Sequence, residues 1–337
     1  MKVLFVNETL VYELLPMEEC VRLVGDALAA LSRGGAVQPL RSLMRLPDGS
    51  GVLGLMPGYL REPVSFGLKV VSVMPGNRGT PYDSHQGVVM LFGAAHGEPL
   101  AILDASAITA IRTGAASAAA TDVLARADAG DLALIGSGTQ ARSHLTAMAT
   151  VRRLRRVRVW SRTRANAERF AREWSAAATL EIEVMTTAED AVRGADLVCT
   201  VTSTREPVVR GAWLAPGAHV NAAGACFPTH RELDTEAVRR ARFYTDCRDS
   251  CRNESGDFLI ARSEGAIGED HLLGEVGEVL IGKVSGRLSG DDVTVFKSLG
   301  IAIEDLASAH AIHQRALATG TGVWLDWSGS DQLSRNH

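Results

Sequence analysis

The sequence predicts an α/β protein in which a doubly wound parallel sheet is joined to a second, α+β domain. Three observations support this prediction. A glycine-rich loop follows a fully apolar strand at residues 132–135, and strands alternate with helices from there to residue 246. Between residues 38 and 103 the pattern differs, because short apolar runs are broken by glycine and proline, which is typical of an antiparallel or mixed sheet. A length of 337 residues also favours two domains over one.

The first domain is expected to comprise residues 1–126 together with residues 300–330. It begins with a short strand at residues 3–6. A helix then runs from Pro16 to Gly34, with proline in its first turn and glycine at its end. The alanine-rich stretch that follows the sheet, residues 104–126, predicts one long helix or two short ones.

The second domain is expected to cover residues 127–299. After the strand and helix around the glycine loop, the pattern predicts strands at 157–160, 181–185, 196–202, 219–224 and 242–246, with helices at 164–177 and 187–193. Residues 297–318 predict an amphipathic helix that leaves this domain and packs on the first. The polar tail from Ser328 is expected to fray.

Composition excludes several classes of protein. A hydrophobic content of 46% and a charged content of 22% are ordinary for a globular chain. The net charge of -4 predicts no nucleic-acid partner, and no apolar run reaches the ~20 residues of a membrane span. The N-terminus has no signal-peptide pattern, and five irregularly spaced cysteines fit a reducing cytoplasm better than a disulfide framework. Their spacing predicts no metal site.

The loop at residues 136–141 carries the strongest functional signal. Gly136 permits a tight turn, Gly138 lets the backbone approach a pyrophosphate, and Ala141 permits close packing of helix on strand. Thr139 and Gln140 open the helix, whose free N–H groups favour phosphates. The loop lies inside a βαβ unit, which predicts a Rossmann-type domain with a nicotinamide dinucleotide as cofactor.

The next strand indicates which dinucleotide binds. A site specific for NAD(H) usually has an acid at the end of this strand, to bind the ribose 2′-hydroxyl. Here Ser161, Arg162 and Thr163 follow Trp160, and none is acidic. A guanidinium and two hydroxyls suit a 2′-phosphate, so NADP(H) is favoured over NAD(H). The alternative is that Arg162 is merely solvated.

Small residues also end later strands of this domain. Thr202 lies at the end of the fourth strand and Ala223 at the end of the fifth. Ligands bind outside the carboxyl ends of strands in open α/β sheets, so both residues are candidates for contact with the nicotinamide half of the cofactor. The alternative for each is simple strand termination.

The first domain contributes cations in apolar surroundings. Arg45, Lys69 and Arg112 each lie within or beside an apolar run. A buried cation requires an anion, so these three residues are candidates for binding a substrate carboxylate. His85 lies in the same domain and is a candidate lining residue, although a lone histidine is more often structural.

These motifs, taken in order along the chain, resemble the ornithine cyclodeaminase/mu-crystallin family. The resemblance covers nearly the whole chain. Its anchors are Leu53-Gly54-Leu55-Met56-Pro57, Lys69, Ser84-His85-Gln86, residues 108–113, residues 136–141, residues 160–163, residues 216–221, residues 231–234, Glu254-Ser255-Gly256-Asp257 and residues 295–300.

The resemblance implies a homodimer whose first domain supplies the dimer interface and the substrate pocket. It implies that Arg45, Lys69 and Arg112 hold the carboxylate of a small imino or amino acid. It also implies that Ser298 and Leu299 contact the nicotinamide end of the cofactor. Glu254 matches a residue near the active site in the mu-crystallin branch.

Two departures from the family pattern concern the chemistry. Cyclodeaminases and the family's alanine dehydrogenases carry an aspartate just after the fifth strand, where this chain has Cys226. Cyclodeaminases also carry a glutamate shortly before the Met-Pro pair, where Gly54 stands. Cyclisation of ornithine requires such carboxylates, and a thiol cannot replace one beside an ammonium. The chain therefore resembles the mu-crystallin (ketimine reductase) branch more closely, and Cys226 is either a site residue or a small filler.

The leading hypothesis is an oxidoreductase in which NADPH reduces an α-imino acid, with Lys69 handling the proton on the imine nitrogen. The first alternative is an ornithine or lysine cyclodeaminase or an amino-acid dehydrogenase. The second is a non-enzymatic protein that uses NADPH to shape a ligand pocket, as the crystallin relatives suggest.

Overall fold

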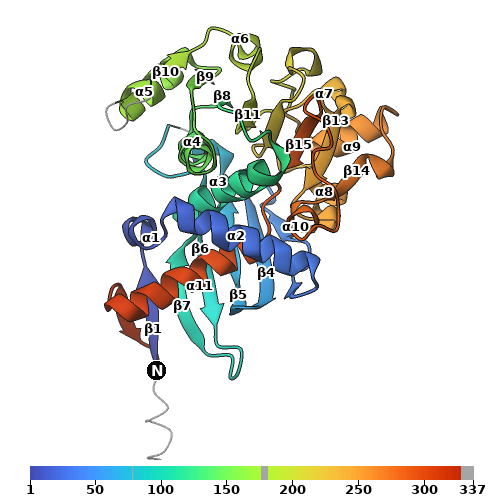
Figure 1. Cartoon of the computed structure of the whole chain (residues 1–337). Coiled ribbons are helices and arrows are strands. Elements are labelled where there is room, and N and C mark those ends of the chain that lie inside the picture. Colours follow the sequence, from blue (N-terminus) through green and yellow to red (C-terminus); the bar gives the residue numbers. More distant parts are fainter. Residues whose placement is uncertain (78, 176–180, 328–337) are drawn as a thin grey trace, which may run out of the picture. The chain divides into compact units, whose positions relative to one another are not determined.

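The computed structural model describes residues 1–77, 79–175 and 181–327, and its contacts divide the chain into two compact units (Figure 1). Unit 1 consists of Met1–Leu23, Arg33–Arg112 and the stretch that begins at Ile301. Unit 2 consists of Val24–Ser32 and Thr113–Gly300. The polar tail from Ser328, expected to fray, lies outside the described residues.

Unit 1 contains a mixed eight-stranded sheet in the order β16-β1-β7-β6-β5-β4-β2, with β3 paired to β4. Only β1 and β7 run parallel; the other pairs are antiparallel. The strands are β1 (Lys2–Val6), β2 (Ala36–Val37), β3 (Ser42–Arg45), β4 (Val52–Arg61), β5 (Val64–Val73), β6 (His85–Phe92), β7 (Pro99–Asp104) and β16 (Val323–Asp326). The sheet matches the mixed sheet expected between residues 38 and 103, extended by β1 and β16.

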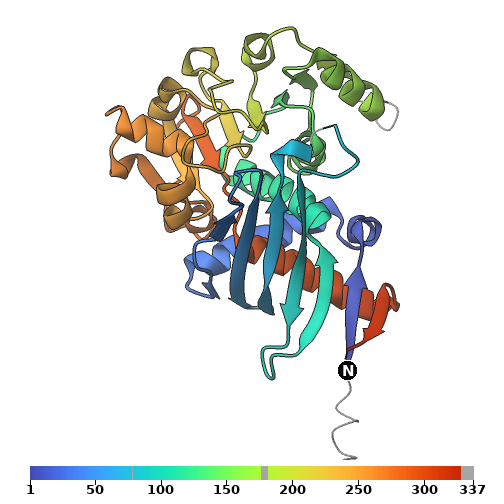
Figure 2. The same cartoon turned by 180° about the vertical axis from the view of Figure 1, so that it is seen from behind.

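Helices cover one face of this sheet. The long helix α11 (Ala302–Thr319) packs across β4, β5 and β6 (Figure 1). The shorter α1 (Glu8–Leu14), which the sequence pattern did not reveal, contacts α11 and β7. In the described part of the chain no helix covers the opposite face of β4, β5 and β6, which is seen in Figure 2.

Unit 2 contains eight parallel strands in the order β10-β9-β8-β11-β12-β15-β13-β14. The strands are β8 (Asp131–Ile135), β9 (Arg156–Trp160), β10 (Ile182–Val184), β11 (Leu197–Thr200), β12 (His219–Ala222), β13 (Ala241–Thr245), β14 (Leu272–Glu275) and β15 (Val293–Lys297). The helices are α4 (Thr139–Val151), α5 (Arg164–Ser175), α6 (Ala188–Val192), α7 (Thr235–Arg240), α8 (Arg248–Glu254), α9 (Gly256–Ser263) and α10 (Val276–Leu280). The predicted doubly wound parallel sheet is confirmed.

One expected element is wrong in its extent. The helix expected over residues 297–318 begins only at Ala302, and Lys297 ends strand β15 instead. Gly300, whose φ is +73°, lies between the strand and the helix. The strand was missed because Val293–Lys297 is buried throughout, and a short apolar run of this kind has no alternating pattern to separate it from a helix.

The contacts divide the chain at Arg112, whereas the sequence pattern suggested residue 126. This boundary lies inside the single helix α3 (Ala105–Leu124). The second half of α3 belongs to unit 2 because Ser117 Oγ lies 2.9 Å from His144 Nε2 and Thr121 Oγ1 accepts a 2.9 Å hydrogen bond from Asn221. Helix α2 (Met17–Ser32) is divided in the same way after Leu23.

Candidate active site

The glycine loop of unit 2 lies between β8 and α4. Gly136 has a φ of +126°, and a Cβ at this position would lie 2.9 Å from both Cγ2 and the carbonyl oxygen of Val201, so only glycine fits. Gly138 is the N-cap of α4 and provides no side-chain cap. A Cβ on Gly138 would meet no atom within 4 Å, whereas Ala141 is fully buried. The open space above the helix N-terminus fits a pyrophosphate group.

The residues after β9 lie next to this loop in the sheet. Gly136 N donates to Trp160 O at 2.8 Å, which ties the loop to the end of β9. Arg162 and Thr163 are exposed and Ser161 is half-buried. The neighbouring Arg164 is paired with Glu168 at 2.8 Å. The structure thus brings a guanidinium and two hydroxyl-bearing residues to the strand end at which dinucleotide sites bind the ribose.

Three predicted cofactor residues follow neighbouring parallel strands, β11, β12 and β15. Ala223 N donates to Thr200 O at 2.9 Å, and Ser298 N donates to Ala222 O at 3.1 Å. Thr202 lies two residues beyond β11. Because the carboxyl ends of parallel strands meet at one edge of a sheet, these residues share the edge that carries Gly136.

A buried carboxylate that the sequence interpretation missed holds this edge together. Glu232 is fully buried and accepts four hydrogen bonds: from Thr200 Oγ1 at 2.9 Å, Thr202 N at 2.6 Å, Thr202 Oγ1 at 2.7 Å and Gly224 N at 2.7 Å. Burial raises the pKa of Glu232. The carboxylate joins the ends of β11 and β12, and its only sequence signal was its place in the motif Arg231–Asp234.

Two further buried aspartates bind backbone N–H groups of unit 2. Asp246 Oδ2 accepts from Leu299 N at 2.6 Å and from Gly300 N at 2.7 Å. Asp257 Oδ1 accepts from Glu232 N at 2.8 Å and from Leu233 N at 2.9 Å. The segment after β15, which contains Leu299, is therefore fixed by a carboxylate from the end of β13.

The loop that carries Cys226 is fixed by a buried lysine. Lys297 Nζ donates to Ala225 O at 2.5 Å and lies 3.0 Å from Asp257 Oδ2, and both charged side chains are 0% exposed. Burial alone would lower the pKa of Lys297, but the charges of Asp257, Cys226 and Glu232 outweigh it and raise this pKa. Cys226 itself is half-buried, with its Sγ 3.9 Å from Ala223 O.

Glu254 ends α8 in the same unit. A Cβ on the following Gly256 would lie 2.0 Å from His230 O and 2.8 Å from Phe227 O. The junction after Glu254 thus packs against the loop that follows Cys226.

In unit 1 the sheet register places three predicted residues on one face. Arg45 pairs with Val52, Val52 with Val73, and Val73 with His85. Paired residues share a face, and so do residues four apart on one strand, so Lys69 on β5 lies on the same face as Arg45 and His85. Arg45 and His85 are exposed, whereas Lys69 is buried.

The buried cations of unit 1 are paired with carboxylates of the chain itself. Asp305 Oδ1 lies 3.2 Å from Lys69 Nζ and 3.0 Å from Arg112 Nε. Glu304 Oε2 lies 2.8 Å from Arg112 Nη1. Lys69 also donates a 2.6 Å hydrogen bond to Thr109 Oγ1. The sequence interpretation missed both acids, although two acidic residues opening a helix that packs on a sheet were a usable signal.

The amine of Lys69 is the perturbed titratable group of this cluster. Burial lowers the pKa of Lys69 to about 8, Asp305 opposes this shift, and the charges of Arg112 and Arg41 add to it. An amine with a pKa near neutrality can donate and accept a proton at physiological pH. Unit 1 therefore contains an amine that can exchange a proton near neutral pH, and its buried cations have carboxylate partners within the chain.

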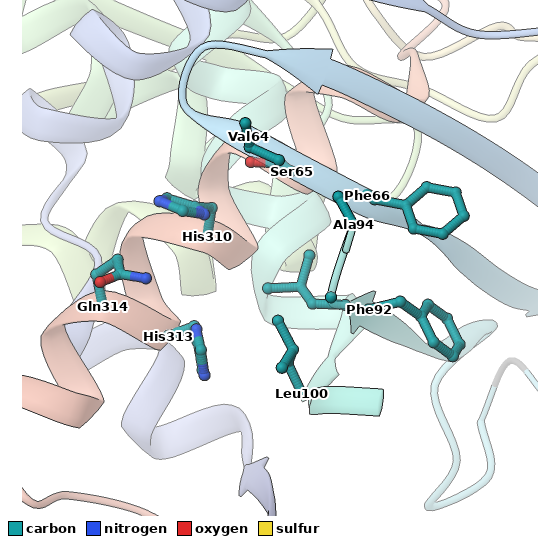
Figure 3. A pocket seen from close by; sticks show the side chains of 11 residues that line it. Val64, Ser65, Phe66, Phe92, Ala94, Leu100, His310, His313 and Gln314 are labelled. Atoms are coloured by element: carbon teal, nitrogen blue, oxygen red, sulfur yellow. The ribbon is translucent and has the colours of Figure 1, made fainter. Parts of the chain in front are cut away.

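A cavity of about 230 Å³ lies elsewhere in unit 1, between α11 and the ends of β5 and β6 (Figure 3). His310, His313 and Gln314 line it from the helix, and Ser65 and Phe66 line it from β5. None of the residues predicted to bind substrate or cofactor contributes to its wall. In the described part of the chain there is no cluster of three or more potential metal ligands, and no helix is both long and apolar enough to cross a membrane.

Comparison with known proteins gives the family. The model of the ornithine cyclodeaminase/mu-crystallin family matches residues 1–320. The chain belongs to this family. The chain is 39% identical over 290 residues to ketimine reductase mu-crystallin of Mus musculus, covering 85% of this chain and 88% of the relative.

Two solved structures share the whole fold of this family member. One is Thermococcus litoralis Delta(1)-pyrroline-2-carboxylate reductase in complex with NADH and L-proline, with a TM-score of 0.93 and 36% identity over 95% of this chain and 99% of that chain. The other is an archaeal alanine dehydrogenase dimer with bound NAD, with a TM-score of 0.92 and 31% identity over 97% of this chain and 100% of that chain.

Proposed function

We propose that the protein is a nicotinamide-dependent reductase that converts an α-imino acid, cyclic or formed from a 2-oxo acid and an amine, into the amino acid. The observation that carries this proposal is the buried Lys69, whose pKa is lowered to about 8. The family membership and the imine-reducing activities named for the mouse and Thermococcus litoralis relatives support it.

Lys69 is proposed to donate the proton to the imine nitrogen. A bound nicotinamide supplies the hydride to the imine carbon, and a protonated imine is the better hydride acceptor. An ammonium has three N–H bonds, and the hydrogen bonds to Thr109 and Asp305 account for two of them. The third N–H is available in this proposal for the nitrogen of the substrate.

Arg45 and Arg112 are proposed to bind the substrate carboxylate, with the charge of Lys69 adding attraction and His85 lining the same face of the sheet. The acids of α11 change the charge balance of this site. Glu304 and Asp305 are paired with Lys69 and Arg112, so these four groups carry no net charge when all are ionised. The exposed Arg45 then adds positive charge for an incoming carboxylate.

The cofactor is proposed to be NADP(H). Gly136, Gly138, Thr139 and Gln140 would bind the pyrophosphate at the start of α4. The 2′-phosphate would be bound by Ser161, Arg162 and Thr163. Thr202, Ala223, Ser298 and Leu299 would contact the nicotinamide half. The exposed Arg162 and the lack of an acid at residues 160–163 support NADP(H) over NAD(H).

Cys226 and Gly54 support net reduction over cyclodeamination. The side chain at residue 226 is a half-buried thiol, and Glu254 is proposed to lie beside it at the active site. Gly54 has no side chain to supply a carboxylate, and a Cβ there would lie 3.3 Å from Val71 Cγ1, so a larger residue would require Val71 to shift slightly. Neither position provides the anion that an ornithine δ-ammonium would need.

A homodimer formed through unit 1 is part of the proposal. Met44, Leu55 and Phe66 are 57%, 39% and 43% exposed on strands of its sheet, and Leu55 and Phe66 point to the face opposite α11. Exposed apolar residues clustered on one sheet face are typical of an interface between subunits. Light scattering of the wild type and of Phe66→Asp tests this: the dimer should give way to monomer in the variant, and a monomeric wild type would contradict it.

The assay that tests the reductase follows NADPH oxidation with pyrroline-2-carboxylate, piperideine-2-carboxylate and pyruvate with methylamine. We expect turnover of at least one of these imines and formation of the amino acid. Release of ammonia from ornithine or lysine without net NADH formation would instead assign cyclodeaminase activity. Absence of turnover with every imine would refute the proposed reduction.

A further inference from the structure

We infer that Asp305 is the residue that positions Lys69, the proposed proton donor. Asp305 holds the ammonium of Lys69 in place. Because the same carboxylate also binds Arg112, the ammonium of Lys69 can still release its proton. The inference rests on the proposed function, since it concerns the residue that acts on the imine nitrogen. Asp305 itself is fully buried on α11 and is not offered as a group that touches the substrate.

Two contacts determine where the ammonium of Lys69 points. Thr109 Oγ1 donates to Ala105 O at 2.6 Å, so the hydroxyl proton is directed away and a lone pair accepts from Lys69 Nζ at 2.6 Å. Asp305 Oδ1 accepts from the same nitrogen at 3.2 Å. With Cε as the third fixed point, these contacts orient the remaining N–H bond.

Asp305 differs from an ordinary ion-pair partner because two cations share its carboxylate. Its Oδ1 accepts from Lys69 Nζ at 3.2 Å and from Arg112 Nε at 3.0 Å, so one oxygen serves two cations. The guanidinium keeps its charge throughout the accessible pH range, so part of the carboxylate's attraction is always committed to Arg112. A carboxylate committed to Lys69 alone would hold the lysine proton more tightly.

Among the residues that the structure describes, the charged and titratable groups around Lys69 come from four elements. They are Asp305 and, through Arg112, Glu304 on α11; Arg112 on α3; Arg41 before β3; and His85 on β6. Desolvation and then the charge of Lys69 lower the pKa of His85, so His85 adds no positive charge near neutral pH. Burial outweighs the charge of Asp305 and lowers the pKa of Lys69.

The test compares the alkaline limb of kcat/KM in wild type and Asp305→Asn. Proton donation requires protonated Lys69, so wild-type activity should fall as the pH rises through about 8. Asparagine keeps an acceptor oxygen but removes the negative charge, so the limb should move to lower pH by about one unit or more. Glu304→Gln is the matched control, because Glu304 is the adjacent carboxylate and lies 2.8 Å from Arg112 Nη1. Its limb should move less.

A second measurement does not depend on activity. The rate at which acetic anhydride acetylates Lys69, followed by mass spectrometry against pH, reports the deprotonated amine directly. Its midpoint should fall in Asp305→Asn and rise in Arg112→Gln, because removal of the guanidinium leaves Asp305 to Lys69. This opposite shift keeps the inference testable if Asp305→Asn does not fold.

The two measurements distinguish failure of the proposed function from failure of the role inferred for Asp305. If wild type reduces no imine, the proposed function fails, while the acetylation midpoints still test the role of Asp305. Asp305 would be structural only if Asp305→Asn changed neither the alkaline limb of kcat/KM nor the acetylation midpoint and reduced kcat equally at every pH. Equal shifts in Asp305→Asn and Glu304→Gln would likewise overturn the inference, as would an unchanged midpoint in Arg112→Gln.

Discussion

Each unit of the protein buries a lysine beside an aspartate, and the pKa values of the two lysines are shifted in opposite directions. In unit 1, Lys69 lies 3.2 Å from Asp305, and burial lowers its pKa to about 8. In unit 2, Lys297 lies 3.0 Å from Asp257, and neighbouring negative charges overcome the effect of burial and raise its pKa. Distance to the carboxylate and degree of burial are similar, so neither explains the difference.

The difference lies in what else shares the carboxylate. Asp305 is shared with Arg112, which competes for its charge. Asp257 binds backbone N–H groups with its other oxygen, and Glu232 adds a second negative charge near Lys297. A buried lysine with surplus negative charge serves as a fixed structural cation, whereas one whose partner is shared with a guanidinium can transfer a proton near neutral pH.

The largest expected effect is on turnover in Lys69→Met. Removal of a general acid should lower kcat by about 10³-fold, measured by NADPH oxidation with an imine. The fold should persist, because Asp305 keeps Arg112 as its partner. The exposed Lys2 gives the control Lys2→Met, which should retain full activity. Turnover within tenfold of wild type would show that Lys69 is not the proton donor.

Lys297→Met should show the opposite profile. It leaves the fully buried Asp257 without its cation, which should lower the free energy of unfolding by about 3 kcal/mol in urea denaturation. Lys283→Met is the control, since its side chain is 61% exposed beside Glu278 and its loss should cost little. An alkaline limb of activity that moves in Lys297→Met, with stability unchanged, would reverse the roles assigned to the two lysines.

Gly138→Ala tests whether unit 2 binds the cofactor and takes no part in proton transfer. Its new methyl group would meet no protein atom within 4 Å, so stability should fall only by the small cost of replacing glycine with alanine at the N-cap of α4. It would occupy the space needed by the pyrophosphate, and we expect cofactor binding about 30-fold weaker, about 2 kcal/mol, by fluorescence titration. Gly290→Ala is the matched control, because a Cβ there also meets no atom within 4 Å. Equal binding in both variants would argue against this pyrophosphate site.

The smallest expected effect concerns the choice of dinucleotide. Arg162→Ala should weaken NADPH binding about tenfold and leave NADH binding nearly unchanged, because only NADPH carries the 2′-phosphate. Arg164→Ala is the control, since Arg164 is already paired with Glu168. Neither change should move the alkaline limb set by Lys69. Equal loss of NADPH and NADH binding in Arg162→Ala would contradict the preference for NADP(H).

The sequence predicted those features of the fold that depend on the local pattern of residues. The parallel sheet of unit 2 followed from buried strands alternating with amphipathic helices, and the role of Gly136 followed from its place between a strand and a helix. The family resemblance, carried by motifs spread along the chain, was confirmed by a family model that matches residues 1–320.

The sequence did not reveal which charges meet across long separations. Lys69 and Asp305 are 236 residues apart, so the pattern around Lys69 and Arg112 indicates buried cations but not the acids in a distant helix that pair with them. Glu232 was missed for a related reason: a carboxylate that accepts four hydrogen bonds has the same local pattern as one in solvent. Pairing of this kind depends on tertiary packing, which cannot be inferred from a short stretch of sequence.

Helix α3 has a consequence for engineering the protein by exchange of segments. Most of unit 2 is a single insertion, Thr113–Gly300, so a relative's cofactor-binding segment could be grafted as one cassette. The first junction would fall inside a continuous helix, directly after Arg112 and five residues before Ser117, which contacts His144 of unit 2. One residue gained or lost there would turn everything beyond it by about 100° around the helix axis. Such chimaeras must therefore conserve the residue count of α3 before any change in cofactor preference can be interpreted.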